Sequence, residues 1–143
     1  MIVLDTNVIS ELWKREPDPA VLAWIDAQVV ESLYLASVTV AELRYGIAAM
    51  PVGKRRAIYH DRLEREVLPV FRGRILPFDL ETSKNYATLM ANARAGGRAI
   101  AKEDGYIAAT AHANGMMIAT RDVSPFVAAS LSIINPWERN ADA

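Results

Sequence analysis

Residues 1–12 read MIVLDTNVISEL, and the carboxylate in the middle of this stretch decides how the fold is interpreted. The apolar run MIVL, with β-branched Ile2 and Val3, is typical of a short strand buried on both faces of a parallel sheet. An apolar pattern with helical spacing follows Asp5 directly. Because burying an unpaired carboxylate costs several kcal/mol, Asp5 either caps that helix or takes part in chemistry.

The rest of the chain repeats this alternation of strand and helix. Expected strands cover residues 1–4, 32–37, 74–78, 116–120 and 131–135, and expected helices cover residues 6–13, 19–30, 37–50, 54–68, 79–95 and 101–114. This alternation predicts an α/β fold, a Rossmann-like parallel sheet of about five strands flanked by helices. The 143 residues fit a single domain, with about 136–143 as a C-terminal tail.

The composition excludes several kinds of site. Sixteen basic and seventeen acidic residues leave a formal net charge of −1, so binding of nucleic acid needs a local basic patch. The absence of cysteine excludes disulfides and thiolate metal sites, and His60 and His112, far apart in the sequence, argue against a zinc site. MIVL lacks the basic region of a signal peptide, and the apolar stretches fall short of the ~20 residues of a membrane helix. We therefore expect a soluble, cytoplasmic protein that does not engage a membrane.

Four acidic residues are expected at the edge of the sheet where the strands end, which is where open parallel sheets bind ligands. Asp5 and Asp122 follow strands, whereas Glu42 and Asp104 lie near the starts of helices. Each acid also has a structural explanation, either as a cap or as a first-turn acid favoured by the helix dipole. These explanations account for less when the acids are taken together, because Glu42 and Asp104 lie in otherwise apolar segments, TVAEL and DGYIAATA.

A resemblance to a known family rests on six stretches in order: LDTNVIS (4–10), TVAELRYG (39–46), RLEREVLPVFRGRILPFD (62–79), DGYIAATA (104–111), ATRD (119–122) and NPW (135–137). Together they resemble the PIN-domain ribonucleases of the VapC type, in particular the FitB-like toxins. The resemblance covers almost the whole chain and implies a PIN-like fold.

The same resemblance implies a set of site residues. By position, the family's catalytic and metal-binding acids fall on Asp5, Glu42, Asp104 and Asp122, and its supporting polar positions fall on Thr6, Asn7 and Thr120. Two carboxylates ~5 Å apart repel by roughly 3 kcal/mol at an effective dielectric of 20, so clustered acids favour a divalent cation. Oxygen-only ligands match Mg²⁺ or Mn²⁺, with Asp5 and Asp104 expected as direct ligands and Asn7 and Thr120 expected to orient them.

RNA as the substrate is implied by the resemblance alone. Four arginines are candidates for binding its phosphates: Arg44, Arg94, Arg98 and Arg121. A second basic stretch, GKRRAIYHDRLER (53–65), is interrupted by acids and is interpreted as a solvated helical face.

The resemblance also implies partners. A VapB- or FitA-like antitoxin is expected to block the site and to contact DNA, so this chain would reach DNA only indirectly. A homodimer or a larger assembly with the antitoxin is expected as well. Trp13, Trp24, Tyr45 and Met50 are either core residues or part of these partner surfaces.

The chain departs from the family pattern at two places. Pro125 stands where many relatives carry another acid, which leaves four acids and puts any fifth ligand in doubt. Lys102 and Glu103 occupy a stretch that is often small and uncharged, and they are interpreted as a solvated helix start, with contact to Asp104 or to phosphate as the alternative.

Two other functions are considered. A phosphatase with an aspartyl nucleophile would need a second acid two residues after Asp5, where this chain has Asn7. The other is a catalytically silent PIN-like module that only binds an antitoxin and acts in a DNA-bound complex.

Overall fold

The computed structural model describes residues 1–138, so residues 139–143 of the expected tail lie outside the described residues, while residues 136–138 form a turn after the last strand. Five parallel strands form one sheet in the order β3-β2-β1-β4-β5. The strands are β1 (Ile2–Leu4), β2 (Leu33–Ala36), β3 (Ile75–Leu76), β4 (Met117–Ala119) and β5 (Ile133–Ile134). The parallel α/β sheet predicted from the sequence is confirmed.

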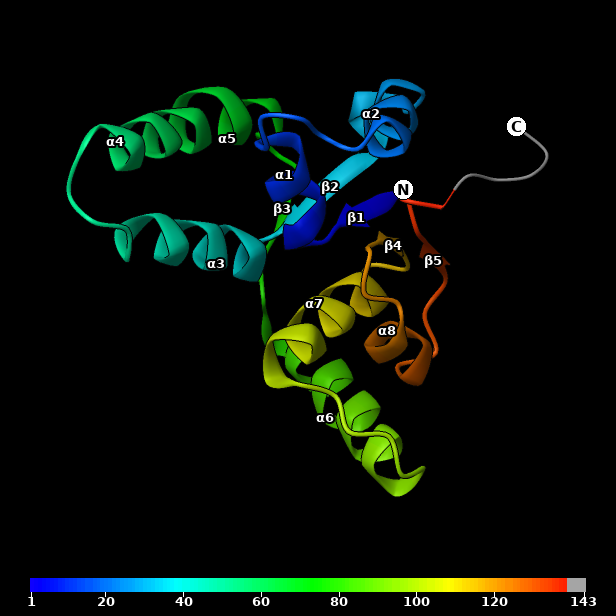
Figure 1. Cartoon of the computed structure of the whole chain (residues 1–143). Helices are drawn as coiled ribbons and strands as arrows, with labels where there is room; N and C mark the ends of the chain where they lie inside the picture. Colours follow the sequence, from blue (N-terminus) through cyan, green and yellow to red (C-terminus); the bar gives the residue numbers. More distant parts are fainter. Residues whose placement is uncertain (139–143) are drawn as a thin grey trace.

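Helices cover both faces of the sheet (Figure 1). Packed on one face are α1 (Thr6–Leu12), α2 (Pro19–Asp26), α3 (Ser37–Ala48), α4 (Lys54–Asp61) and α5 (Leu68–Val70). Packed on the other are α6 (Leu80–Ala95), α7 (Lys102–Ala113) and α8 (Ser124–Ala128).

The first strand shows why both faces need cover. Ile2 and Leu4 point into the core beneath α1 and α3, while Val3 points into the core beneath α6 and α7. Side chains alternate between the faces of a strand, so a strand buried on both faces is apolar throughout. The run MIVL therefore places β1 in the middle of the sheet, and Asp5 directly follows its carboxyl end.

Three local expectations are corrected. The helix expected at 19–30 ends at Asp26, and a 3₁₀ turn, Val30–Ser32, leads from an extended Val29 into β2. The helix expected at 54–68 widens into a π-helical segment, Arg62–Val67, just before Pro69, which has no N–H to continue the α-helical ladder. The short helix α8 was not expected. Pro125 sits in its first turn, a position proline favours.

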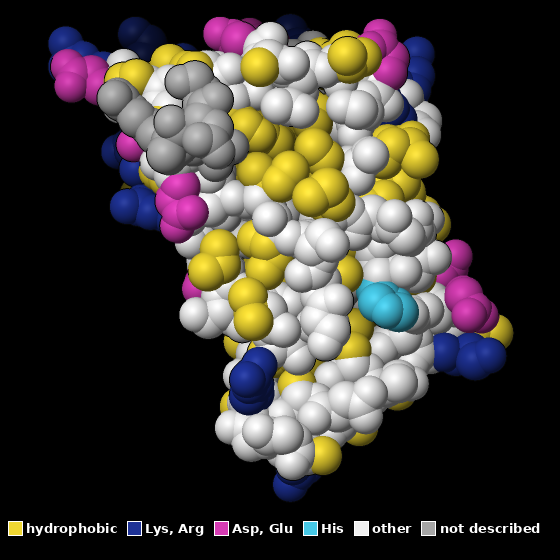
Figure 2. Space-filling model, turned by 90° about the vertical axis from the view of Figure 1, so that its right-hand side faces the viewer, with side chains coloured by type: hydrophobic (Ala, Val, Ile, Leu, Met, Phe, Trp, Pro, Cys, Tyr) yellow, Lys and Arg dark blue, Asp and Glu magenta, His cyan; other side chains and the backbone are white. Residues whose placement is uncertain are grey.

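In Figure 1, β1 and β2 run away from the side of the molecule that holds β5 and α8. On that side, hydrophobic side chains gather in the middle of the surface, and most charged side chains lie towards its margins (Figure 2). No helix within residues 1–138 is long and apolar enough to cross a membrane.

Candidate active site

A cavity of about 400 Å³ lies at the carboxyl ends of β1 and β4, where the strand order reverses direction. Open α/β sheets bind ligands at such a reversal. Seven of the residues predicted from the sequence line this cavity: Asp5, Thr6, Asn7, Glu42, Asp104, Arg121 and Asp122. The four predicted acids therefore face one space, which we call the acidic cavity.

Asp5 is buried at the floor of the acidic cavity, with 6% of its surface exposed. Its Oδ1 accepts from the backbone N–H of Thr6 at 2.7 Å, so it caps α1, and its Oδ2 accepts from Thr120 Oγ1 at 2.8 Å. Burial raises the pKa of Asp5 above its ordinary value despite these hydrogen bonds, and the charges of Glu42 and Asp122 raise it further. A cap that served the helix alone would not need burial beside two other carboxylates.

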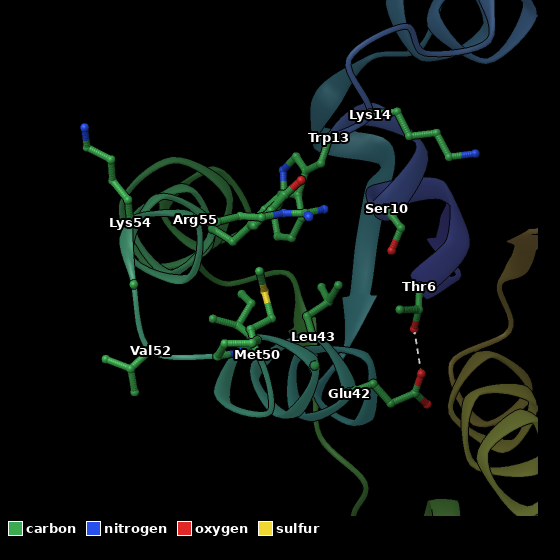
Figure 3. A pocket seen from close by; sticks show the side chains of 15 residues that line it. Thr6, Ser10, Trp13, Lys14, Glu42, Leu43, Met50, Val52, Lys54 and Arg55 are labelled. Carbon is green, nitrogen blue, oxygen red and sulfur yellow. Dashed lines mark hydrogen bonds between the residues drawn. The ribbon is translucent and has the colours of Figure 1, made fainter.

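The supporting polar residues connect the acids to one another. Thr6 Oγ1 donates to Glu42 Oε2 at 2.9 Å, which links the start of α1 to α3 (Figure 3). Thr120 Oγ1 accepts from Asn7 Nδ2 at 3.3 Å and from the backbone N–H of Asp122 at 3.1 Å. These hydrogen bonds fix the acids of three separate elements relative to each other.

Glu42 lies in the second turn of α3, because that helix begins at Ser37, so the first-turn explanation by the helix dipole does not apply to it. Its Oε1 is buried and has no hydrogen-bond partner within residues 1–138, and the same holds for Thr39 Oγ1 one turn earlier. Burial raises the pKa of Glu42, and the charges of Asp104 and Glu103 add to this effect. A buried carboxylate oxygen without a partner is unfavourable unless something else binds it.

Asp104 lies in the first turn of α7, as the sequence predicted. Partial burial raises its pKa, and so do the charges of Asp5 and Asp122 across the cavity. The next residue, Gly105, is buried against α6, where an added Cβ would lie 2.6 Å from Met90 Sδ and 3.1 Å from Tyr86 Cε2. The small residue therefore lets α7 approach α6 closely and aims the start of α7 at the cavity.

The donor chemistry of the acidic cavity fits a hard divalent cation. Its potential ligands are all oxygens, one of them the unpaired Glu42 Oε1, and three of the acids have raised pKa values. In their present rotamers, no three acidic or histidine side chains within the described residues are grouped closely enough to hold one ion. The residues therefore fit such an ion in type, whereas their present geometry is not that of a closed metal centre.

The four predicted arginines lie in different places. Arg121 lines the acidic cavity, but Arg44 pairs with Glu64 through two contacts of 2.8 and 3.0 Å and lines a separate hollow. Arg94 lies in the last turn of α6 and Arg98 follows that helix, and neither lines the acidic cavity.

Four residues that line the acidic cavity were not predicted for the site: Ser10, Glu11, Lys14 and Trp137. A signal for two of them was present, because Thr6, Ser10 and Lys14 follow one another at intervals of four, the spacing of one helical face. Trp137 belongs to the NPW stretch that had been noted only as part of the resemblance.

A larger hollow of about 740 Å³ adjoins the acidic cavity, and we call it the apolar groove. Its walls come from α1, α3, α4 and the loop before α4, and Trp13, Leu43 and Met50 point into it (Figure 3). The groove and the acidic cavity share a wall made of Thr6, Ser10, Lys14 and Glu42. Of the aromatic residues considered for partner binding, Trp13 and Trp24 are partly buried against the core, whereas Tyr45 is 76% exposed.

The sequence matches the PIN domain over residues 2–129. The chain belongs to the PIN-domain family. The chain is 70% identical to the VapC ribonuclease Y4jK of Sinorhizobium fredii over 138 residues, which cover 96% of this chain and 99% of the relative. It is 48% identical to the toxin FitB of Neisseria gonorrhoeae over 137 residues, again with 96% and 99% covered. The resemblance predicted from the motifs is thereby confirmed.

Solved structures give the same assignment for this PIN domain. A FitAB complex bound to a DNA fragment named IR36 contains a chain 45% identical to it, with a TM-score of 0.95 and 100% of both chains covered. FitAcB from Neisseria gonorrhoeae contains one that is 47% identical, with a TM-score of 0.94, covering 97% of this chain and 100% of the other. A DNA-bound VapBC complex of Salmonella typhimurium, 20% identical with a TM-score of 0.71, supports the fold alone.

Proposed function

We propose that this PIN domain is the toxin of a type II toxin–antitoxin pair, a cytoplasmic endoribonuclease that depends on a divalent metal. The names of the relatives support a ribonuclease and a toxin. The observation that carries the catalytic part is the acidic cavity itself. Asp5, Glu42 and Asp104 gather at the reversal point of the sheet with raised pKa values, and one oxygen of Glu42 lacks a partner.

In this proposal the four acids hold Mg²⁺ or Mn²⁺, with Asp5 and Asp104 as direct ligands and Glu42 and Asp122 acting directly or through water. A bound ion would activate a water and offset negative charge on a phosphodiester during in-line displacement. Thr120 and Asn7 keep Asp5 in one orientation through their hydrogen bonds. Arg121, which lines the cavity, is the arginine proposed to bind a phosphate of the substrate.

The apolar groove is the proposed seat of an antitoxin segment. Peptide segments with an apolar face, such as amphipathic helices, commonly bind in hydrophobic grooves. Because the groove shares Thr6 and Glu42 with the acidic cavity, a segment lying in it would also obstruct the cavity. DNA contact would then come only through a VapB- or FitA-like antitoxin, and the chain would act as a homodimer or in a larger assembly with it.

The catalytic proposal is tested with the purified chain on total cellular RNA, with Mg²⁺, with Mn²⁺ and with a chelator. Cleavage should require metal and be lost in Asp5→Asn, since asparagine caps helices as well as aspartate does and so preserves α1. Asp79→Asn, in the remote cap of α6, is the matched control and should cleave normally.

Equal cleavage by Asp5→Asn, or cleavage that survives the chelator, would overturn the assignment of a metal-dependent nuclease site to the acidic cavity. If the chain is inactive yet still binds a VapB- or FitA-like antitoxin, the alternative holds: a silent PIN-like module in a DNA-bound complex. The observation that favours this alternative is that no three acidic or histidine side chains within the described residues are grouped closely enough to hold one ion.

A further inference from the structure

The wall of the acidic cavity formed by the end of α1 carries a cation that the proposed function leaves unused. Lys14 Nζ lies 2.7 Å from Glu11 Oε2, and Glu11 Oε1 accepts from the backbone N–H of Asp18 at 3.0 Å. Asp5 and Glu11 are the two charged side chains that are buried within residues 1–138, and Glu11 has 5% of its surface exposed. The lysine itself is exposed, so a buried and doubly bonded carboxylate anchors a solvent-facing ammonium group.

A second cation that lines the acidic cavity is held by a different partner. The Arg121 guanidinium lies over the Trp137 ring, with Cζ 5.6 Å from the ring centroid, and both residues line the acidic cavity. No carboxylate within the described residues pairs with Arg121. Lys14 and Arg121 both line the acidic cavity and so face a common space. Hydrogen bonds from Lys14 and from the backbone of Asp18 lower the pKa of Glu11, and the charge of Arg121 adds to this effect.

The direction of the Lys14 side chain indicates whether its ammonium group faces the acidic cavity or the apolar groove. In Figure 3 its ammonium group points away from Trp13 and Met50, which line the apolar groove. A lysine ammonium has three donors, and Glu11 occupies one of them, which leaves two for a ligand.

We propose that Lys14 and Arg121 form a cationic wall that binds backbone phosphates of single-stranded RNA next to the phosphate to be cleaved, and that Glu11 and Trp137 position these two cations. The proposal rests on the proposed nuclease function and adds to it a substrate-binding surface. A cavity lined by both acids and cations suits a polyanion whose reacting phosphate meets a metal ion and whose flanking phosphates meet cations. An acidic peptide segment would meet the cations equally well, but it would be repelled by the four acids without gaining a reaction.

Binding is measured separately from cleavage, with a labelled single-stranded oligoadenylate of about ten nucleotides and the Asp5→Asn chain, which keeps the RNA intact. Adding Lys14→Gln should weaken binding about tenfold at low salt. It should also reduce the slope of log affinity against log salt by about 0.7, the value for one phosphate contact to a single strand. Lys84→Gln is the matched control, because Lys84 forms the same i,i+3 pair with Glu81 on α6, remote from the acidic cavity. It should change neither quantity.

The positioning role of Trp137 has a readout that a purely structural role would not move. Trp137→Leu should weaken oligoadenylate binding as much as Arg121→Gln does, and the double variant should be no weaker than Arg121→Gln alone. Trp137→Phe keeps an aromatic face and should restore binding. Trp24→Phe, a partly buried tryptophan elsewhere in the same core, controls for general loosening, and melting temperatures are recorded for all variants.

In the otherwise unmodified chain, Lys14→Gln should raise KM for RNA about tenfold and leave kcat within about twofold, because the interaction is made with bound substrate and transition state alike. If the chain cleaves RNA and Lys14→Gln leaves both KM and the salt slope unchanged, the cationic wall is disproved while the nuclease assignment stands. Weaker binding of the antitoxin with unchanged binding of oligoadenylate would disprove it too, and would assign the wall to the partner. Lys14-dependent RNA binding by a chain that never cleaves would support the wall and disprove the nuclease assignment.

Discussion

The acidic cavity and the apolar groove share a wall, yet they are incomplete for opposite reasons. The cavity gathers carboxylates whose mutual repulsion the protein does not neutralise, whereas the groove leaves apolar side chains such as Val52 without cover. A small ion can relieve the first deficiency, and only a surface with apolar side chains can relieve the second. The comparison suggests that the two hollows take different ligands and that each can be disabled without the other.

The largest expected effect belongs to Glu42, on the shared wall. Glu42→Gln keeps an oxygen that can accept from Thr6 but removes the charge, so RNA cleavage should fall by about a hundredfold or more, as for loss of a metal-binding group. Cleavage rates in saturating Mg²⁺ and Mn²⁺ provide the measurement. Binding of the antitoxin should be nearly unchanged, and a variant that lost both would show that the two hollows are one site.

The reverse separation is expected for the apolar groove. Met50→Asp places a charge among Trp13 and Leu43 and should weaken antitoxin binding about tenfold or more, with RNA cleavage retained. Tyr45→Asp on α3 is the matched control, because Tyr45 is exposed and lines neither hollow. Titration of the purified chain with antitoxin measures both variants, and equal weakening by the two would place the partner elsewhere on α3.

The third prediction concerns the stability of the acidic cavity without metal. The folded pKa of Asp104 is raised, so its contribution to stability is fully present below the unfolded pKa of about 3.9 and is lost as pH rises through the folded pKa. Asp104→Asn removes the titrating carboxyl group, and with it this loss of stability at higher pH. The metal-free variant should therefore melt a few degrees above the unmodified chain at neutral pH, and the difference should shrink towards zero as the pH falls to about 4.

With metal bound, the unmodified chain should melt at a higher temperature than Asp104→Asn. Mg²⁺ or Mn²⁺ should raise the melting temperature of the unmodified chain and have little effect on Asp104→Asn. Glu103→Gln, an exposed acid in the same turn of α7, controls for the helix dipole. If Asp104→Asn melts lower without metal and still gains stability from it, Asp104 acts as a helix-start acid and not as a ligand.

The acidic cavity and the apolar groove also show which parts of the structure can be predicted from the sequence. The run MIVL and the acid after it predict β1 and the position of Asp5, because a strand buried on both faces and a carboxylate at its end leave few alternatives. The groove and the place of Lys14 beside Arg121 in the cationic wall were not predictable in this way. They depend on α1, α3 and α4 meeting in space, and on Glu11 being buried, which a helical pattern alone does not reveal.

Single residues show the same limit. Gly105 belongs to the DGYIAATA stretch that was recognisable in the sequence. Its packing against Met90 depends on how α6 and α7 lie against each other, which the stretch itself does not predict. The π-helical segment before Pro69 and the short helix that starts at Ser124 are local backbone conformations that the hydrophobic periodicity does not predict. Arg44 stood near Glu42 in the sequence, yet successive side chains on a helix point in different directions, and this one reaches Glu64 instead.

The smallest expected effect comes from that arginine. Arg44→Gln removes a bidentate but largely exposed pair with Glu64, and exposed pairs contribute about 0–1 kcal/mol, so the melting temperature should fall only slightly. Because Arg44 lines neither the acidic cavity nor the apolar groove, kcat and KM for RNA should stay within about twofold of the unmodified chain. Arg121→Gln, measured beside it, should raise KM. If Arg44→Gln raised KM as much, RNA would have to contact α3 as well as the acidic cavity. The acidic cavity and the apolar groove could then no longer be treated as separate sites.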